Sequence, residues 1–168
     1  MALSMYQVTT PVFVRGLGVL ATLLAKGQAH ADATGVTHET MLAKRLAPDM
    51  LPLSRQVQIA ADAAKFAVAR LSGVDAPKFA DTETTFAQLQ ERLANTVAYL
   101  ESVTAAQLEG SETRSVTLSA GEFNPTFTGE GYLLQFALPN FYFHITTAYD
   151  LLRHQGVQIG KLDFLGPM

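Results

Sequence analysis

The segment from Thr128 to Gly156 constrains this 168-residue chain more than any other. It begins with threonine, which commonly caps a helix, and it closes with glycine, which commonly ends one. Between Tyr132 and Ile145 nearly every residue is apolar, on all sides of the helix that the segment would form. A helix of this kind is buried on every side, either inside a bundle or in a contact between subunits. The sequence therefore predicts an all-α protein arranged around this helix.

Composition narrows the class of protein further. The length fits one domain, residues 1–168, with a complete hydrophobic core. Charged residues form 16% of the chain and hydrophobic residues 48%, against about a quarter charged in ordinary domains, so we expect a homodimer that hides apolar surface. The net charge of −3 argues against a nucleic-acid-binding protein, which would carry a basic stripe. The absence of cysteine excludes disulfides and thiolate metal sites, and we expect a cytoplasmic protein.

The N-terminal apolar run raises the alternative of a signal peptide or membrane span. Gly16 to Ala25 follows Arg15 and precedes an Ala-x-Ala sequence at residues 29–31, as in a secretory signal. Lys26 interrupts the supposed cleavage region, however, and the run is about half the length that a bilayer requires. We interpret it as the first helix of a bundle, with no membrane partner.

Capping residues and periodic apolar positions predict four long helices. The predicted spans are Ser4 to Ala33 with a second start at Thr10-Pro11 and a stop at Gly35, Asp49 to Gly73, Thr85 to Ser102 with Gln88 completing a capping box, and Thr128 to Gly156. Short turns are predicted at residues 37–44 and at the Thr104/Gln107 box. Between the third and fourth helices, residues 114–127 alternate in polarity and predict a small β-hairpin that turns at Ser119-Ala120-Gly121, with Phe123 and Phe127 flanking a proline. The tail, residues 156–168, has no regular period and is expected to lie over the bundle.

The polar residues within the fourth helix mark a candidate site. Asn140 and His144 are four residues apart and therefore share one face. Gln58 and Asp62 have the same spacing in the second helix and are the expected partners of that face. Pro139 removes the N–H that the carbonyl of residue 135 would use, so we expect a bend there. The predicted pocket residues are Gln58, Asp62, Asn140, His144 and Tyr149.

A metal site is the sharpest hypothesis for this face, and a hydrogen-bonded cluster is the simpler one. His144 and His154 are ten residues apart, or ~15 Å along a helix, and cannot share an ion. A site formed by Asp62, Asn140 and His144 is conceivable, but an amide is a poor transition-metal ligand. We favour a polar cluster that satisfies a buried histidine, and so favour no cofactor. No Gly-x-Ser-x-Gly sequence or phosphate-binding loop is present.

Four segments together resemble a known family. LAPDMLPLSRQVQIA, DTETTFAQL, FALPNFYFHITTAYDLLRHQGV and KLDFLG are similar to the uncharacterised DUF1993 branch of the DinB-like superfamily. The resemblance spans essentially the whole chain. It implies a four-helix bundle with a long connection between helices two and three, and often a dimer. Better-known members bind a divalent metal through a helix-two histidine and a helix-four His-x-x-x-His, and some are thiol-dependent transferases or hydrolases.

This chain departs from that metal pattern. Only His144 matches, Asn140 stands at the first helix-four position, and the second helix contains no histidine. Our leading hypothesis is a protein that binds a small molecule between helices two and four without a functional metal triad. The alternatives are a divalent-metal-dependent transferase or hydrolase that uses Asp62, Asn140 and His144, and a structural or interaction protein in which the cluster only fixes the core. No motif identifies a substrate or a pathway.

Overall fold

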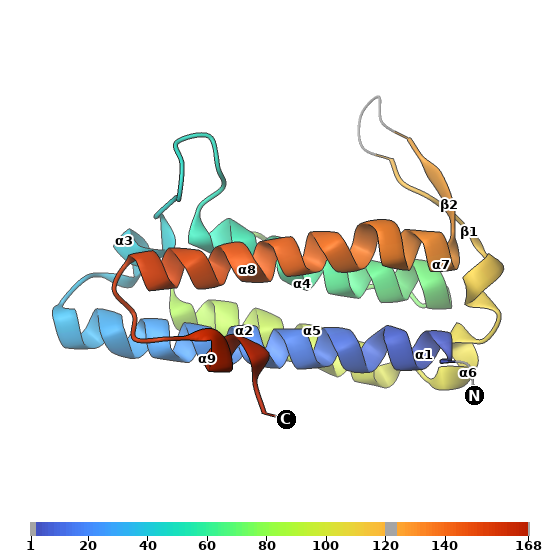
Figure 1. The fold of residues 1–168 in the computed structure, drawn as a ribbon, viewed down its shortest axis with the longest axis horizontal. Helices are drawn as coiled ribbons and strands as arrows, with labels where there is room; N and C mark the ends of the chain where they lie inside the picture. The colour runs from blue at the N-terminus through green and yellow to red at the C-terminus, as the bar shows by residue number, and fades with distance from the viewer. Residues whose placement is uncertain (1–2, 120–123, 168) are drawn as a thin grey trace.

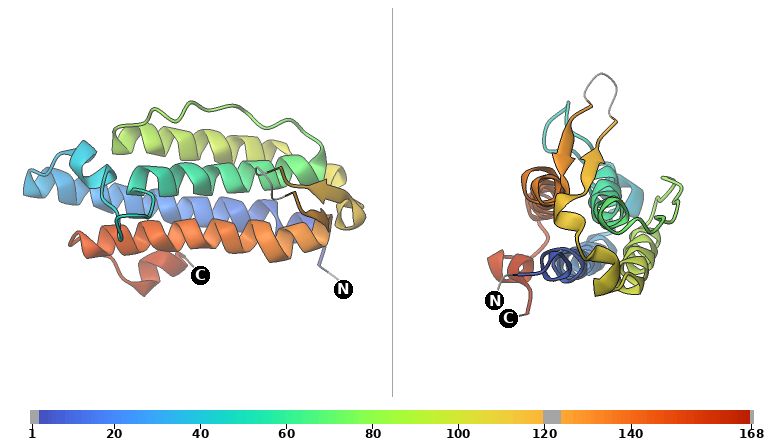
Figure 2. Two further views of the ribbon diagram at one scale, coloured as in Figure 1. Left: turned by 90° about the horizontal axis from the view of Figure 1, so that it is seen from above. Right: turned by 90° about the vertical axis from the view of Figure 1, so that its right-hand side faces the viewer.

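Four long helices run side by side in the computed structural model, which describes residues 3–119 and 124–167 (Figures 1 and 2). They are α2 (Thr10–Thr34), α4 (Leu53–Ser72), α5 (Phe86–Ser102) and α8 (Leu138–His154). The shorter elements are α1 (Met5–Val8), α3 (His38–Leu42), α6 (Ala105–Leu108), η1 (Ser111–Thr113), β1 (Ser115–Thr117), β2 (Thr126–Thr128), α7 (Gly129–Tyr132), η2 (Leu133–Ala137) and α9 (Lys161–Leu165). Both α2 and α4 pack against α5 and α8, which gives the order α2, α5, α4, α8 around the bundle. The predicted all-α bundle with a small hairpin is confirmed.

The first predicted helix is divided at Thr9. Ser4 and Gln7 form a capping box at the start of α1, and α2 begins one residue after Thr9 with Pro11 in its first turn. Proline is tolerated there because the first turn of a helix has no N–H partner to lose. Gly35 ends α2 in the left-handed conformation, with φ of 72°. The second start at Thr10-Pro11 and the glycine stop are therefore confirmed.

The second long helix starts later than predicted. Asp49 was expected to cap it, but Pro52 occupies the cap position and α4 begins at Leu53. The N–H of Met50 donates to Ala47, so Asp49 lies within a preceding turn, and the N–H of Leu53 donates to Lys44. These bonds use the backbone that an earlier start would have needed. The predicted stop at Gly73 is confirmed, with φ of 80°.

The capping boxes predicted at Thr85 and at Thr104 are both present. Thr85 pairs with Gln88 at the start of α5, and Thr104 pairs with Gln107 at the start of α6. Residues 73–85, which join α4 to α5, contain no helix or strand. This is the predicted long connection, and Figure 2 shows it running back along the bundle. Strands β1 and β2 pair antiparallel, with Val116 opposite Phe127, whereas part of the predicted turn, residues 120–121, and Phe123 lie outside the described residues.

The fourth predicted helix is continuous but changes its hydrogen bonding. The Thr128 side chain caps α7, η2 is a π-helical segment, and α8 carries Pro139 in its first turn. The N–H of Leu138 donates to the carbonyl of Leu133, five residues earlier. The wider turn comes directly before the proline, which lacks an N–H of its own. The chain turns after α8 with Gly156 at φ of 91°.

The apolar sequence of the fourth helix predicted burial on every side. The structure shows that one face of this helix is exposed instead. Phe141, Ile145 and Ala148 are buried, but Leu134 and Phe143 are 52% and 56% exposed. Burial of an all-round apolar helix needs neighbours on every face. In one copy of this chain α8 packs mainly against α4 and α2, which leaves its outer face open.

Close contact between α2 and α8 explains the residues at their crossing. The rings of Phe13 and Phe141 meet edge to face at 4.9 Å between centroids. A Cβ at Gly16 would lie 2.5 Å from the Phe141 ring, so any larger residue would force that buried ring to move. Alanines also form part of the buried face of α4: Ala60, Ala64 and Ala67 have no exposed surface, which permits near approach of the neighbouring helices.

The C-terminal tail lies over α2, as predicted, but it also contains a short helix. Arg15 donates to the carbonyl of Leu165 at 2.6 Å, and Lys26 forms an ion pair with Asp163 at 2.6 Å. Asp163 also accepts from the N–H of Gly160 at the start of α9. The helical segment from Met5 to Thr34 is long and apolar enough to cross a membrane by length and composition. Half of its most apolar stretch is buried in the bundle, as in a core helix of a bundle.

Candidate functional site

The predicted site residues lie along the contact between α4 and α8, but they do not form one cluster. His144 is 8% exposed, and its Nδ1 lies 2.7 Å from Oε1 of Gln56. The predicted partner was Gln58 or Asp62, which is wrong for this histidine. Helix geometry explains the difference, because Gln58 lies two residues further along α4 and therefore faces about 160° away from Gln56.

The bond to Gln56 determines which ring nitrogen of His144 carries the proton. The amide nitrogen of Gln56 donates to the carbonyl of Leu51 at 3.0 Å, so its oxygen faces the imidazole. An amide oxygen only accepts, and Nδ1 must therefore carry the proton, which leaves the lone pair on Nε2. Burial lowers the pKa of His144 below its ordinary value, because a desolvated imidazolium is unfavourable. His144 is neutral at pH 7.

Asp62 and Asn140 line the same hollow, which is separate from the bond between Gln56 and His144. The hollow has a volume of about 160 Å³ and lies between α4 and the fourth helical segment. Its other lining residues are Ile59, Ala63, Phe66, Arg70, Tyr132, Phe136 and Ala137. The structure thus brings two of the predicted pocket residues into one cavity and places His144 on the next turn of α8.

The carboxylate of Asp62 is already neutralised by two cations. Its Oδ1 lies 2.8 Å from Nζ of Lys65 and 2.9 Å from Nη2 of Arg92. Both cations are buried, with side chains 3% and 2% exposed. A carboxylate held in this way is a structural partner of α5 more than a free base or ligand.

Gln58 belongs to a different group of residues. It donates to Glu83 at 2.8 Å and accepts from Arg55 at 2.7 Å, both on the side of α4 that faces the connection to α5. Tyr149 lies apart from both groups: its ring packs against Phe164 of α9 at 5.8 Å. Gln58 and Tyr149 are not among the residues that line the hollow between α4 and α8.

The sequence analysis missed the buried charge network centred on Arg92. This side chain contacts Asp62, Asp81 and Glu83, at 2.9, 3.0 and 2.9 Å. It therefore joins α4, α5 and the connection between them. The signal was present in the sequence, since Arg92 follows Leu89 by three residues and lies within the apolar stripe of its helix.

The network perturbs the acidity of its carboxylates. Burial raises the pKa of Glu83, but hydrogen bonds from Arg92, the Glu83 backbone and Gln58 outweigh it, and the pKa falls below its ordinary value. The hydrogen bond from Arg55 lowers the pKa of Asp81, and the charge of Arg92 lowers it further. Both groups are therefore charged at pH 7.

Arg70 and Tyr132 form the second feature that sequence reasoning missed. Nη1 of Arg70 donates to the Tyr132 hydroxyl at 2.9 Å, and the guanidinium lies 5.4 Å from the centre of the Phe66 ring. All three residues line the hollow. Among the described residues no carboxylate pairs with Arg70. The hollow therefore contains one cation whose charge is unmatched in that part of the chain.

The π-helical segment η2 helps to shape this hollow. It supplies Phe136 and Ala137 to the lining, and Tyr132 precedes it directly. A π-turn inserts an extra residue into a helix and changes which side chains face a neighbour, and such segments are frequent at functional sites. Among the described residues, no three histidine, aspartate or glutamate side chains gather where they could hold a metal ion.

Four long helices with a polar face shared by α4 and α8 define a DinB-like bundle. The structure is similar to the crystal structure of a DinB family member from Shewanella denitrificans, with a TM-score of 0.90 and 42% sequence identity over 98% of this chain and 93% of that one. The family model of the domain of unknown function DUF1993 matches residues 5–165. The chain belongs to the DUF1993 family. No curated protein matches it.

Proposed function

We propose that this protein binds a small carboxylate in the hollow between α4 and α8. The observation that carries the proposal is Arg70, whose guanidinium lines the hollow beside aromatic rings and has no carboxylate partner among the described residues. A guanidinium presents paired N–H groups that match the two oxygens of a carboxylate. Asn140 lines the same hollow and supplies a further donor and acceptor.

The size of the hollow limits the ligand. Its volume of about 160 Å³ corresponds to roughly five water molecules at ~30 Å³ each. Pockets for drug-sized ligands are usually about 300–1,000 Å³. The rings of Phe66, Tyr132 and Phe136 supply apolar walls. The ligand is therefore a compact acid whose apolar part has few atoms.

We further propose that this site works without a resident divalent metal, although the DinB-like resemblance implies one. Among the described residues no three histidine, aspartate or glutamate side chains gather where they could hold a metal ion, and His144 would offer a single ligand atom, Nε2, because its Nδ1 is bonded to Gln56. Asp62 accepts from two buried cations, and an amide such as Asn140 is a weak ligand for transition metals. This donor set does not fit the metal, so the metal-dependent transferase or hydrolase is the weaker candidate.

Calorimetric titration with acetate, propionate and benzoate tests the proposal. We expect at least one acid to bind the wild-type protein, and Arg70→Gln to remove that binding without changing the melting temperature greatly, because Arg70 is exposed. Lys161→Gln makes the same change in net charge on α9 and should leave binding intact. Binding that survives in Arg70→Gln would contradict the assigned site. If no acid binds at millimolar concentration, the carboxylate proposal is wrong.

A further inference from the structure

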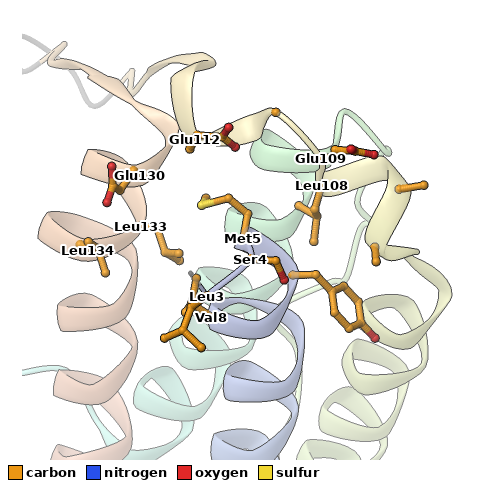
Figure 3. A pocket seen from close by; sticks show the side chains of 14 residues that line it. Leu3, Ser4, Met5, Val8, Leu108, Glu109, Glu112, Glu130, Leu133 and Leu134 are labelled. Atoms are coloured by element: carbon orange, nitrogen blue, oxygen red, sulfur yellow. The ribbon is translucent and has the colours of Figure 1, made fainter. Parts of the chain in front are cut away.

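A larger cavity lies at the end of the bundle where the chain begins, and the function proposed above does not use it. It has a volume of about 870 Å³ and shares no lining residue with the hollow between α4 and α8. Its walls come from the chain around α1, from α6 and η1, and from α7 and η2 (Figure 3). We propose that this end groove binds a small amphipathic amine, with an apolar body and a protonated nitrogen.

Most of the residues that line the groove are apolar. Met5, Leu108 and Leu133 line it with leucine, valine and alanine neighbours, and Figure 3 shows Met5 and Leu133 extending toward the space between the elements. Two lining residues, Leu3 and Leu134, are 75% and 52% exposed. Apolar side chains left in water at a concave surface are typical of a binding groove, because a ligand that covers them removes that surface from water.

The charges at the groove select the sign of the ligand. Glu109, Glu112 and Glu130 line it on the sides of α6, η1 and α7. All three are exposed, and none forms an ion pair within the described part of the chain. Among the described lining residues there is no lysine, arginine or histidine. Three carboxylates that form no ion pair with the described residues attract a cation and repel an anion of the same shape.

Volume and lining favour a small molecule over a protein partner. The volume of the groove falls within the range of about 300–1,000 Å³ that is usual for small ligands. Short elements at the end of the bundle surround the groove, whereas a protein partner would usually dock on a longer face. Tyr6 is also among the lining residues, and aromatic rings attract ammonium groups that come within reach of their faces. An alkyl amine places its chain against the leucines and its nitrogen among the carboxylates.

Titration with n-octylamine and, separately, with octanoate tests this proposal, because the two probes share a chain length and differ in charge. We expect octylamine to bind and octanoate to bind at least tenfold more weakly. Added salt should lower the affinity for octylamine. The triple variant Glu109→Gln, Glu112→Gln, Glu130→Gln should lose at least tenfold in affinity for octylamine. Glu39→Gln, Glu91→Gln, Glu101→Gln makes the same change in net charge at other exposed positions and should bind as the wild type does.

Each other outcome overturns the proposal. Equal binding of octanoate and octylamine would mean that the carboxylates do not select the ligand. Equal loss in both triple variants would assign the effect to net charge and not to the groove. If octylamine fails to bind and a basic amphipathic helical peptide binds instead, the groove is a protein-docking surface. The Arg70→Gln variant should bind octylamine normally, so failure here and failure of the carboxylate proposal are separable.

Discussion

Removing the charge of Arg92 should destabilise the bundle more than removal of any surface charge. Arg92→Met keeps most of the side-chain length but deletes the group that contacts Asp62, Asp81 and Glu83. Breaking a buried ion pair by loss of one partner costs about 3–5 kcal/mol. Here Asp62 and Asp81 are 29% and 39% exposed and Glu83 is 11% exposed. Water can partly solvate the abandoned carboxylates, and we therefore expect about 3 kcal/mol.

The loss should be visible in both denaturant and thermal unfolding. For a chain of this size about 1 kcal/mol shifts the melting temperature by roughly 2–4 °C, so Arg92→Met should melt roughly 6–12 °C below the wild type. Arg55→Met is the matched control, because its ion pair with Asp81 is 39% exposed on both sides. Exposed pairs contribute about 0–1 kcal/mol, and the control should lose no more than that.

The pH dependence gives a second, independent readout. The pKa values of Asp81 and Glu83 are lowered in the folded protein, so their contribution to stability is complete above their unfolded pKa values, 3.8 and 4.5. It is lost as pH falls through the lower, folded values. The difference in unfolding free energy between wild type and Arg92→Met should therefore shrink in strongly acidic buffer. A loss below about 1 kcal/mol at pH 7, or a difference that is the same at pH 7 and pH 3, would refute this account.

The remaining predictions concern the core and the assembly. His144→Ala should cost about 1–3 kcal/mol in urea unfolding, because the amide of Gln56 loses its partner. His144→Gln should recover part of that loss, and added zinc should leave the wild-type melting temperature unchanged; stoichiometric zinc that disappears in His144→Ala would contradict this. Because the pKa of His144 is lowered from 6.5, the wild type should lose stability as pH falls below about 6.5, and His144→Gln should not. Gly129→Ala should not fold stably, because its Cβ would lie 1.9 Å from the carbonyl oxygen of Ser111, whereas Gly18→Ala meets nothing within 4 Å and should fold as the wild type does by circular dichroism. The exposed Phe143 leads us to expect a two-fold homodimer, which a monomer mass in light scattering would exclude.

Local sequence signals predicted the helices well where the stabilising contacts are also local. The capping boxes at Thr85 and Thr104 depend on residues three positions apart, so the sequence contains both partners. Gly35 and Gly73 end helices for a reason that lies in their own backbone conformation. The start of α4 was predicted wrongly because a turn before it, closed by bonds from Met50 and Leu53, depends on how the preceding loop folds back.

The candidate site was predicted only in part. The sequence marked Asn140 and His144 because polar residues are conspicuous in an apolar helix, and it marked Asp62 as a residue of the facing helix. It did not distinguish Gln56 from Gln58 as the partner of His144. That choice depends on the rotation of α4 about its axis, which packing against two neighbouring helices sets.

By itself the sequence determined that four helices form, which faces are apolar, and that the fourth helix carries a polar pair beside a proline. These follow from periodicity, capping and the missing N–H of Pro139, all of which act within a few residues. The tertiary structure alone decided that Arg92 joins three segments, that Arg70 meets Tyr132, and that short elements at one end enclose a groove. Those contacts join residues far apart in the chain, and their geometry depends on the angles and distances at which the helices pack.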